Sequence, residues 1–384
     1  MEFSEERYYK INKILLSNLG LWPHRRTRCA RVKPILIHAT FIYYIFVQLC
    51  TLISSECNMN LLLKVLSSIF PTIIYTLKYS TYYVKATKIQ LLMEVVRKDW
   101  KEFRRQNDKR EIEILHKYAR TIHTYTIVFI LAVFIGNSAF EFLEAFPIIF
   151  DWLMPLNESR PRRVTVLVEY FIDSERYFPL ILLHEFIAVL LGSFTVVSTG
   201  TITLIYMEHA CAMLKIVSFR IEHALEKSVL QYSVAQTERI IYCKIIRAVD
   251  LHRRAIKFFD LILSNFSTSY CIMIIVGVAS ISLNLCRLLQ LADIKDLADL
   301  FTIITLLLIH FVYMFIANYV GQIITDHSED IFNTTCNILW YTAPLQSQKM
   351  LLFLMHRTIK LVKPVVGKMF VASLEGFATV MYTH

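Results

Sequence analysis

The sequence predicts an all-α membrane protein with seven transmembrane helices, an intracellular amino terminus and a cytoplasmic layer of helices. Hydrophobic residues make up 55% of the chain and charged residues 19%, and the mean hydropathy is +0.48, which is far from the averages of soluble domains. Apolar stretches of about 20 residues recur along the chain, which is the length that a membrane-spanning helix needs. Lys and Arg gather in alternate connections between these stretches, which is typical of a multi-pass membrane protein.

Seven apolar stretches are long enough to cross a bilayer as helices. They cover residues 35–53, 61–84, 121–143, 177–205, 259–285, 298–325 and 365–384. The second stretch contains Lys64 and Lys78 near its ends, where long side chains can reach the headgroups. The first 34 residues carry charges throughout and lack an apolar core with a small-residue cleavage site, so we expect no cleaved signal peptide.

The basic residues predict the orientation of the chain. Of the 41 Lys and Arg, 32 fall in residues 1–34, 85–120, 206–258 and 326–364, and six fall in the opposite connections. Because the cytoplasmic side keeps the excess, we expect a cytoplasmic amino terminus and an external carboxyl terminus. This is the reverse of a G-protein-coupled receptor, and residues 144–178 contain no cysteine for that class's usual disulfide. Asn157 begins a glycosylation triplet on the predicted external side.

Several function classes are not favoured by the residues. The formal net charge is +10, but the basic blocks separate apolar segments, which suits membrane topology better than nucleic acid binding. His184 and Glu185 lack the second histidine of a zinc protease motif, and no cysteine and histidine cluster has metal-ligand spacing. We therefore expect no enzyme activity, cofactor or metal. His184, Glu185, Glu141 and His310 either border a binding pocket or satisfy polar groups of neighbouring helices.

Two of the predicted spans continue as helices into the cytoplasm. Apolar residues recur every three or four positions after the fourth span and before the fifth, so each extension has an apolar seam that needs a partner. The first seam consists of Leu204, Met207, Cys211, Leu214, Val217, Ile221 and Leu225, and the second of Ile241, Ile245, Ala248, His252, Ala255, Phe259 and Ile262. The apolar run from Met350 to Met355 lies between charged flanks, which indicates a helix surrounded by other helices. A membrane-surface amphipathic helix is the alternative for this run.

Four segments together resemble an insect odorant receptor, most closely the tuning receptors of hymenopterans. They are LGLWP at residues 19–23, EYFIDSERYFPLILLHE at residues 169–185, LHRRAIKFFDLILSNFS at residues 251–267, and the block NILWYTAPLQSQKMLLFLMHRTIKLVKPVVGKMFVASLEGF at residues 337–377. The resemblance covers essentially the whole chain, and the last block is its most specific part.

The resemblance implies a subunit of a ligand-gated, non-selective cation channel for olfactory transduction. In that family the subunit forms a heterotetramer with a shared co-receptor in the plasma membrane of the sensory dendrite, binds small volatile organic ligands and requires no G protein. The inner extensions of helices four to seven would form the anchor where subunits meet. We accordingly divide the chain into a cytoplasmic segment 1–34, transmembrane helices one to six at 35–325, and a segment 326–384 with the anchor helix and helix seven. The expected anchor residues are Trp340, Leu351, Leu352, Phe353 and Leu354.

The same resemblance implies a ligand pocket in the outer halves of spans two, three and four. Such ligands offer few polar groups and bind mostly by apolar burial. The expected lining residues are Ser67, Phe70, Ile74, Val133, Gly136, Asn137, Phe140, Phe178, Leu182, Phe186 and, from span six, Ile304. Gly136 would leave room for a ligand, and Asn137 would offer it a donor and an acceptor.

Relatives of this kind continue for about a dozen residues past a segment like SLEGFATVMYTH, to an aromatic motif at the outer mouth of the pore. The carboxyl end of this sequence would therefore be truncated, and we expect impaired conduction. Two alternatives remain open. A gustatory receptor would share the fold, and a secondary transporter would show an internal repeat and broken helices, although the chain has only eight glycines.

We predict that an epitope tag placed before Met1 will stain only after the plasma membrane is permeabilised. The reason is the excess of Lys and Arg on the side that carries the amino terminus. Immunofluorescence on intact and permeabilised cells measures this. Staining of intact cells would contradict the orientation.

Overall fold

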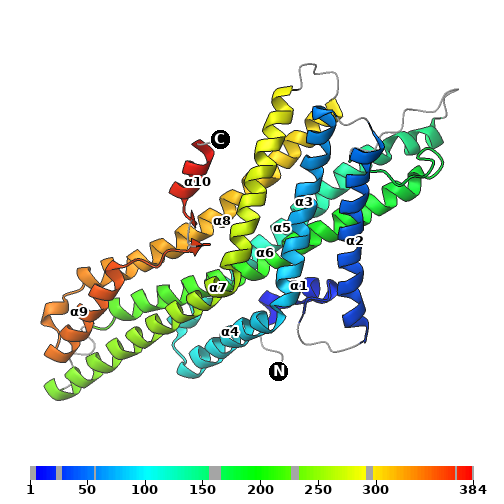
Figure 1. The fold of residues 1–384 in the computed structure, drawn as a ribbon. Coiled ribbons are helices and arrows are strands. Elements are labelled where there is room, and N and C mark those ends of the chain that lie inside the picture. The colour runs from blue at the N-terminus through cyan, green and yellow to red at the C-terminus, as the bar shows by residue number, and fades with distance from the viewer. Residues whose placement is uncertain are drawn as a thin grey trace. The chain divides into compact units, whose positions relative to one another are not determined.

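The chain folds almost entirely into helices, as Figure 1 shows for the computed structural model. The structure describes residues 6–22, 28–55, 58–154, 166–225, 233–290, 297–367 and 370–382. The elements in chain order are α1 (Glu6–Asn18), α2 (Arg28–Ser54), α3 (Met59–Val84), α4 (Ala86–Gln106), α5 (Lys109–Leu153), α6 (Phe178–Glu222), α7 (Val234–Gln290), α8 (Leu297–Asn337), the 3-10 turn η2 (Trp340–Thr342), α9 (Leu345–Ile359), β1 (Val365–Val366), β2 (Phe370–Val371) and α10 (Leu374–Tyr382).

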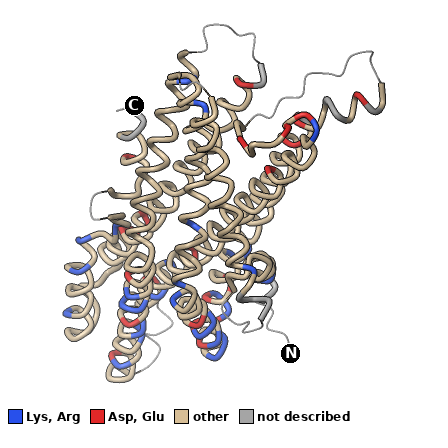
Figure 2. The backbone as a smooth tube through the Cα atoms, turned by 45° about the vertical axis from the view of Figure 1, so that its right-hand side comes forward, with Lys and Arg blue, Asp and Glu red and all other residues tan. Residues whose placement is uncertain are grey.

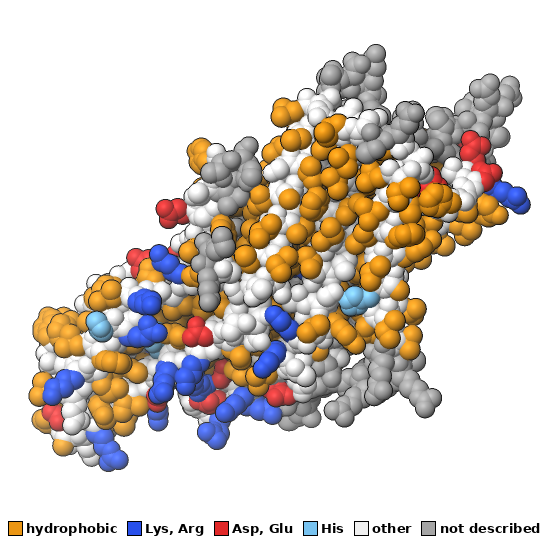
Figure 3. All heavy atoms as spheres, in the orientation of Figure 1, with side chains coloured by type: hydrophobic (Ala, Val, Ile, Leu, Met, Phe, Trp, Pro, Cys, Tyr) orange, Lys and Arg blue, Asp and Glu red, His pale blue; other side chains and the backbone are white. Residues whose placement is uncertain are grey.

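Six helices of the described chain are long and apolar enough to cross a membrane, namely α2, α3, α5, α6, α7 and α8. Each contains one of the first six predicted spans, and these predictions are confirmed. Large apolar side chains stay exposed on the faces of these helices, for example Ile35, Ile42 and Phe46 of α2. Figure 3 shows hydrophobic side chains covering the visible surface of α2 and α3. An exposed apolar surface of this kind suits contact with lipid.

The seventh predicted helix, over residues 365–384, is wrong in its first part. Residues 365–366 pair with residues 370–371 as an antiparallel hairpin, and α10 begins only at Leu374. The backbone leaves the helical region at Gly367, whose φ is 62° and whose N–H donates to Ser267 Oγ at 2.7 Å. The nine residues of α10 span about 13 Å, which is less than the hydrocarbon thickness.

The chain divides into two compact units, each built from three separate stretches. The first unit consists of residues 1–86, 124–201 and 269–314, and the second of residues 87–123, 202–268 and 315–384. The helices α5, α6, α7 and α8 contribute one part to each unit. Figure 2 shows that Lys and Arg gather on limited stretches of the helices, whereas other stretches run for several turns without a charge.

Polar side chains of the first unit satisfy backbone and hydroxyl groups of distant helices. Tyr79 on α3 donates to the carbonyl of Leu19 at 2.7 Å, and Tyr82 donates to the carbonyl of Thr199 on α6 at 2.7 Å. The Asn12 amide on α1 donates to Thr201 Oγ1 at 2.7 Å. These bonds fasten α1, α3 and α6 to one another where buried polar atoms would otherwise lack partners.

The two lysines of α3 have different surroundings. Lys64 forms an ion pair with Asp299 of α8. Lys78 is buried, and its Nζ lies 4.7 Å from the ring centroid of Tyr313 on α8, which is the geometry of a cation–π contact. The expectation that both lysines reach the headgroups is therefore wrong for Lys78.

The two predicted helical extensions pack inside the second unit. Helix α6 continues to Glu222 and α7 begins at Val234, as the periodicity predicts. All seven residues of the second seam are buried, and α6 is buried on nearly every side between Met207 and Ser218. Lys215 is the exposed residue of that stretch, and its Nζ donates to Asp330 Oδ2 of α8 at 2.9 Å. The helical layer predicted from these seams is confirmed.

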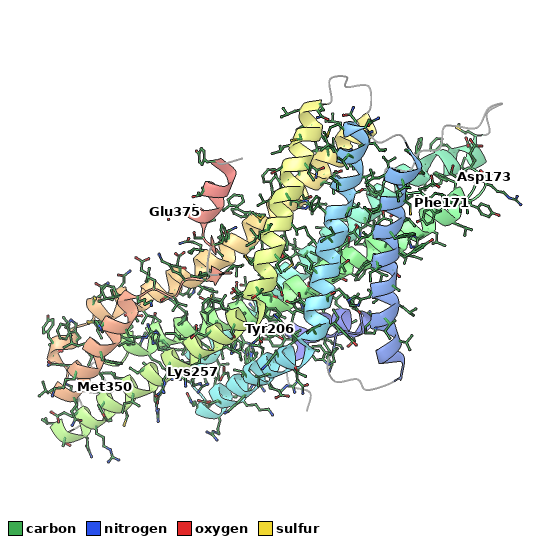
Figure 4. All side chains as sticks on the ribbon, viewed as in Figure 1. Phe171, Asp173, Tyr206, Lys257, Met350 and Glu375 are labelled. Atoms are coloured by element: carbon green, nitrogen blue, oxygen red, sulfur yellow. The ribbon has the colours of Figure 1, made fainter. Side chains whose placement is uncertain are left out.

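The apolar run from Met350 to Met355 lies in α9, on which Figure 4 labels Met350. Within this chain α9 is buried on one face only, through Ser347, Leu351, Leu354 and Thr358. Leu352 is 47% exposed and Phe353 is 68% exposed. Helices of this chain therefore cover one side of the run, while Leu352 and Phe353 face outward. That helices surround the whole run stays a prediction for the assembled subunits.

A charged cluster joins three helices of the second unit. The buried carboxylate of Asp99 on α4 lies 3.0 Å from His209 Nε2 on α6 and forms an ion pair with Arg254 on α7. The same guanidinium donates to Glu102 Oε1 at 2.6 Å. Burial by itself raises the pKa of Asp99, but His209 and Arg254 stabilise its carboxylate, and the resulting pKa lies below the ordinary value.

We predict that Asp99→Asn lowers the free energy of unfolding by about 3 kcal/mol, because the neutral amide leaves His209 without its carboxylate and leaves Arg254 with Glu102 as its remaining anion. A carboxyl whose pKa is depressed by folding stabilises the protein above its ordinary pKa of about 4, and this contribution is lost as the pH falls through the lower, folded-state value. Thermal unfolding of the purified chain between about pH 7 and about pH 3 measures both effects.

The matched control is Asp250→Asn on α7, because Asp250 is exposed and its loss should change stability by less than about 0.5 kcal/mol. Equal stability of the two variants would contradict the role of the Asp99 cluster.

Candidate ligand-binding site

All of the residues predicted to bind a ligand belong to the first unit, on α3, α5, α6 and α8. Ser67 and Phe178 are buried, and Gly136, Phe186 and Ile304 are exposed on outward faces. The remaining six are partly buried, namely Phe70, Ile74, Val133, Asn137, Phe140 and Leu182. Hydrogen bonds join two residues of this set to other spanning helices: Asn137 accepts from Ser193 of α6, and Ser67 accepts from Arg287 of α7.

Ser67 already has partners inside the chain. Its Oγ donates to the carbonyl of Lys64 at 2.9 Å and accepts from the guanidinium of Arg287 on α7. Arg287 in turn lies 4.0 Å from Asp299 of α8. This network connects the ends of α3, α7 and α8, so Ser67 acts mainly as a link between helices.

A polar contact between two spanning helices lies between α5 and α6. We call it the α5–α6 seam and define it by Asn137, Glu141 and Glu144 of α5 and by Glu185 and Ser193 of α6. The three α5 residues follow one another at four and three positions, and the two α6 residues are eight apart, so each set occupies one helix face. Ser193 Oγ lies 3.3 Å from Asn137 Oδ1 and donates to it.

One end of the seam is a small hydrogen-bonding group among apolar side chains. Asn137 Nδ2 is buried and has no hydrogen-bond partner among the described residues. The hydroxyl of Tyr75 on α3 hydrogen-bonds to Ser193, and its ring lies against Gly192, where an added Cβ would be 2.1 Å from Tyr75 Cδ2. A methyl group at residue 192 would therefore displace the Tyr75 ring, and Ser193 contacts both Tyr75 and Asn137.

The other end of the seam gathers carboxyl groups. Glu185 is fully buried and Glu144 is buried, whereas Glu141 is partly exposed. Glu185 lies close enough to Glu144 and Glu141 to interact electrostatically with both, and it also contacts the Tyr44 hydroxyl of α2. A group of acidic side chains inside a membrane-spanning region is costly unless something neutralises it.

His184 takes part in a neighbouring aromatic cluster. Its Nδ1 lies 2.6 Å from the Tyr170 hydroxyl, and its ring packs edge to face against Tyr43 and Tyr44, with centroids 5.3 Å and 5.8 Å away. Of the two hypotheses for His184, this contact supports a group satisfied by its neighbours. Its partner comes from the loop before α6, and Glu185 makes no hydrogen bond to it.

The segment that carries Tyr170 covers part of α2 and α6. Val166, Val168 and Tyr170 pack against Tyr44, Val47 and Ala188, and the N–H of Glu169 donates to the carbonyl of Val47 at 3.0 Å.

Beyond Tyr170 the chain turns at Phe171, whose φ is 56°, and then passes Asp173 before α6 begins. Figure 4 labels Phe171 and Asp173. An irregular segment thus lies against one end of the two helices.

Other predicted groups have simpler outcomes. No group of three or more metal-ligating side chains could hold a metal ion in the part of the chain that the structure describes. Six described cysteines are free thiols. Asn157, the predicted glycosylation site, lies outside the described residues. The α5–α6 seam offers hydrogen-bonding, charged and apolar side chains, which are the groups that bind a small organic molecule.

Sequence reasoning identified Asn137 but missed Ser193, Tyr75, Tyr44 and Gly192. The spacing of Asn137, Glu141 and Glu144 was a usable signal, because polar residues on one face of a spanning helix normally face protein. No comparable signal in the sequence pairs that face with Ser193.

Comparison with known proteins supports a specific family. A family model described as 7tm Odorant receptor matches residues 58–383. The insect olfactory receptor OR5 from Machilis hrabei has a similar structure, with a TM-score of 0.73 and 11% identity over 98% of this chain and 95% of that chain. The same receptor in complex with eugenol matches with a TM-score of 0.73 and 12% identity over the same shares. No individually curated protein sequence matches the chain significantly.

We predict that Gly192→Ala lowers the free energy of unfolding by about 1–3 kcal/mol, because the new methyl group forces the Tyr75 ring away from Ser193. The matched control on the same helix is Gly200→Ala, where an added Cβ meets nothing within 4 Å and should be neutral or stabilising by up to about 1 kcal/mol. Thermal unfolding of the purified variants measures the difference, and equal behaviour would refute the close contact at residue 192.

Proposed function

The chain belongs to the insect odorant receptor family, and from this premise we propose that it is the odorant-binding subunit of a heteromeric, ligand-gated, non-selective cation channel. The observation that carries the proposal is the family match, which extends over most of the chain rather than over one motif. The all-α architecture with six described membrane-capable helices agrees with it. The function is reception of volatile compounds in olfaction.

We place the ligand beside the Asn137 and Ser193 end of the α5–α6 seam. The buried amide of Asn137 has an N–H donor without a partner among the described residues. Tyr75 of α3 and the partly buried Phe140, three residues after Asn137 on α5, offer apolar surface to a ligand. Binding sites for small organic molecules are usually apolar pockets with a few hydrogen-bonding groups. The olfactory receptor of similar fold was solved with eugenol, and a small, mostly apolar ligand of that size is what we expect here.

We propose that α9 joins this subunit to a co-receptor subunit. Leu352 and Phe353 are exposed on α9, and Leu345, Tyr341 and Ile359 near them are exposed as well, whereas Trp340 is partly exposed and Leu351 and Leu354 face the chain's own helices. Exposed apolar side chains rimmed by Lys349, Arg357 and Lys360 are characteristic of a protein interface. The excess of basic residues around these helices supports a cytoplasmic position for them, in a plasma membrane protein with an internal amino terminus.

Electrical recording tests this function. Cells that express the chain together with an insect odorant co-receptor should show currents evoked by volatile compounds, reduced in size because the sequence predicts impaired conduction. The reversal potential should lie close to zero because the channel does not select among monovalent cations. Cells that express the chain alone should show none. Phe353→Asp should abolish the current without lowering the amount of folded chain, because Phe353 is 68% exposed. Currents that do not depend on the co-receptor would contradict the heteromeric channel, and absence of any response to a broad panel would contradict odorant reception.

A further inference from the structure

Two carboxyl groups at the acidic end of the α5–α6 seam, those of Glu185 and Glu141, lie among the described residues without a cationic partner. Both carboxylate oxygens of Glu185 and one oxygen of Glu141 are buried without a hydrogen bond to any described residue. Neither of these residues forms an ion pair with a described Lys, Arg or His. Burying an isolated carboxylate in an apolar interior costs far more free energy than hydrogen bonds between helices contribute. The site must therefore take up a proton or a cation.

Two side chains that carry no charge face the same place from α2. Tyr44 is 3% exposed and Gln48 is completely buried. The Tyr44 hydroxyl lies beside Glu185 and Gln48, but neither this hydroxyl nor the two polar atoms of the Gln48 amide form a well-aligned hydrogen bond of normal length to a described residue. Tyr44 interacts electrostatically with Glu185 and Glu144, and Gln48 lies next to Tyr44. Unsatisfied buried polar groups are rare in folded proteins, and here two of them accompany the unsatisfied carboxylates.

The geometry favours an organic cation over a metal ion. The acidic side chains of the described residues are not arranged closely enough for three of them to hold one metal ion. An alkylammonium group is larger, carries three N–H donors and can reach acceptors that are spread around it. The acceptors available are Glu185, Glu141 and the Gln48 carbonyl, and Val47 and Ala188 beside Tyr44 are apolar.

We propose that the acidic end of the α5–α6 seam, where Glu141, Glu144 and Glu185 lie, is a second ligand subsite, which binds the ammonium group of a small alkylamine. This proposal rests on the proposed function and adds a ligand class to it. Glu185 is the principal counter-charge, Glu141 is the group on the partly exposed side through which the amine enters, and Tyr44 and Gln48 complete the hydrogen bonds. The alkyl chain extends along the seam toward Phe140 and Asn137.

The test compares hexylamine with 1-hexanol, which has the same chain length but no charge. Alkylamines are protonated at neutral pH, as lysine is. Hexylamine should stabilise the purified wild-type chain against thermal unfolding, and its apparent dissociation constant should rise about tenfold or more in Glu185→Gln, which keeps the shape of the side chain but removes its charge. Binding of 1-hexanol should be the same in both proteins.

Glu175→Gln serves as the matched control, because Glu175 is exposed in the loop before α6 and hexylamine binding should not change. If Glu185→Gln does not fold, Glu141→Gln decides by the same criterion. The amine subsite would be overturned if the wild-type chain bound 1-hexanol but not hexylamine, or if all variants bound hexylamine with equal affinity. Either result would mean that the carboxyl groups hold protons, and the proposed function would stand. Binding of neither compound, together with no odour-evoked current, would overturn both.

Discussion

The structure depends on how polar groups are satisfied inside a region that offers no water. In hydrocarbon every backbone donor and acceptor must be paired within a helix, which leaves polar side chains to find partners on other helices. In the α5–α6 seam, α5 presents three polar residues on one face, and Ser193 of α6 donates a hydrogen bond to one of them, Asn137. The contact of Tyr75 with Gly192 brings α3 to the same place. The positions of three spanning helices thus follow from a few polar contacts.

The same requirement separates what the sequence predicts from what it does not. Six spans and both helical extensions could be predicted, because they rest on local features: continuous apolar runs and apolar residues every three or four positions, such as Ile241, Ile245 and Ala248. Asn137, which the resemblance predicts to line a ligand pocket, lies on a face of α5 that contacts α6. The pairing of Asn137 with Ser193 joins residues 56 positions apart, and no pattern within either segment specifies that partner.

One prediction failed for an identifiable physical reason, and another concerns an assembly of more than one chain. Residues 365–373 are apolar enough for a helix, but the left-handed backbone at Gly367 and its hydrogen bond to Ser267 produce a hairpin instead. Periodicity does not detect such a contact, because Ser267 is 100 residues away. The run from Met350 to Met355 was expected to be surrounded by helices, yet Phe353 is exposed in the single chain. Its composition is explained if a second subunit covers it, which connects the exposed face of α9 with a heteromeric channel.

A double-mutant cycle on Asn137→Leu and Ser193→Ala tests most directly whether the polar seam holds α5 against α6. If the two side chains contact each other as described, the losses in unfolding free energy will not be additive, and the coupling energy will be about 0.5 kcal/mol or more, as for other hydrogen bonds between membrane helices. Losses that add within about 0.3 kcal/mol would show that the two residues act independently and would contradict the central role of the seam.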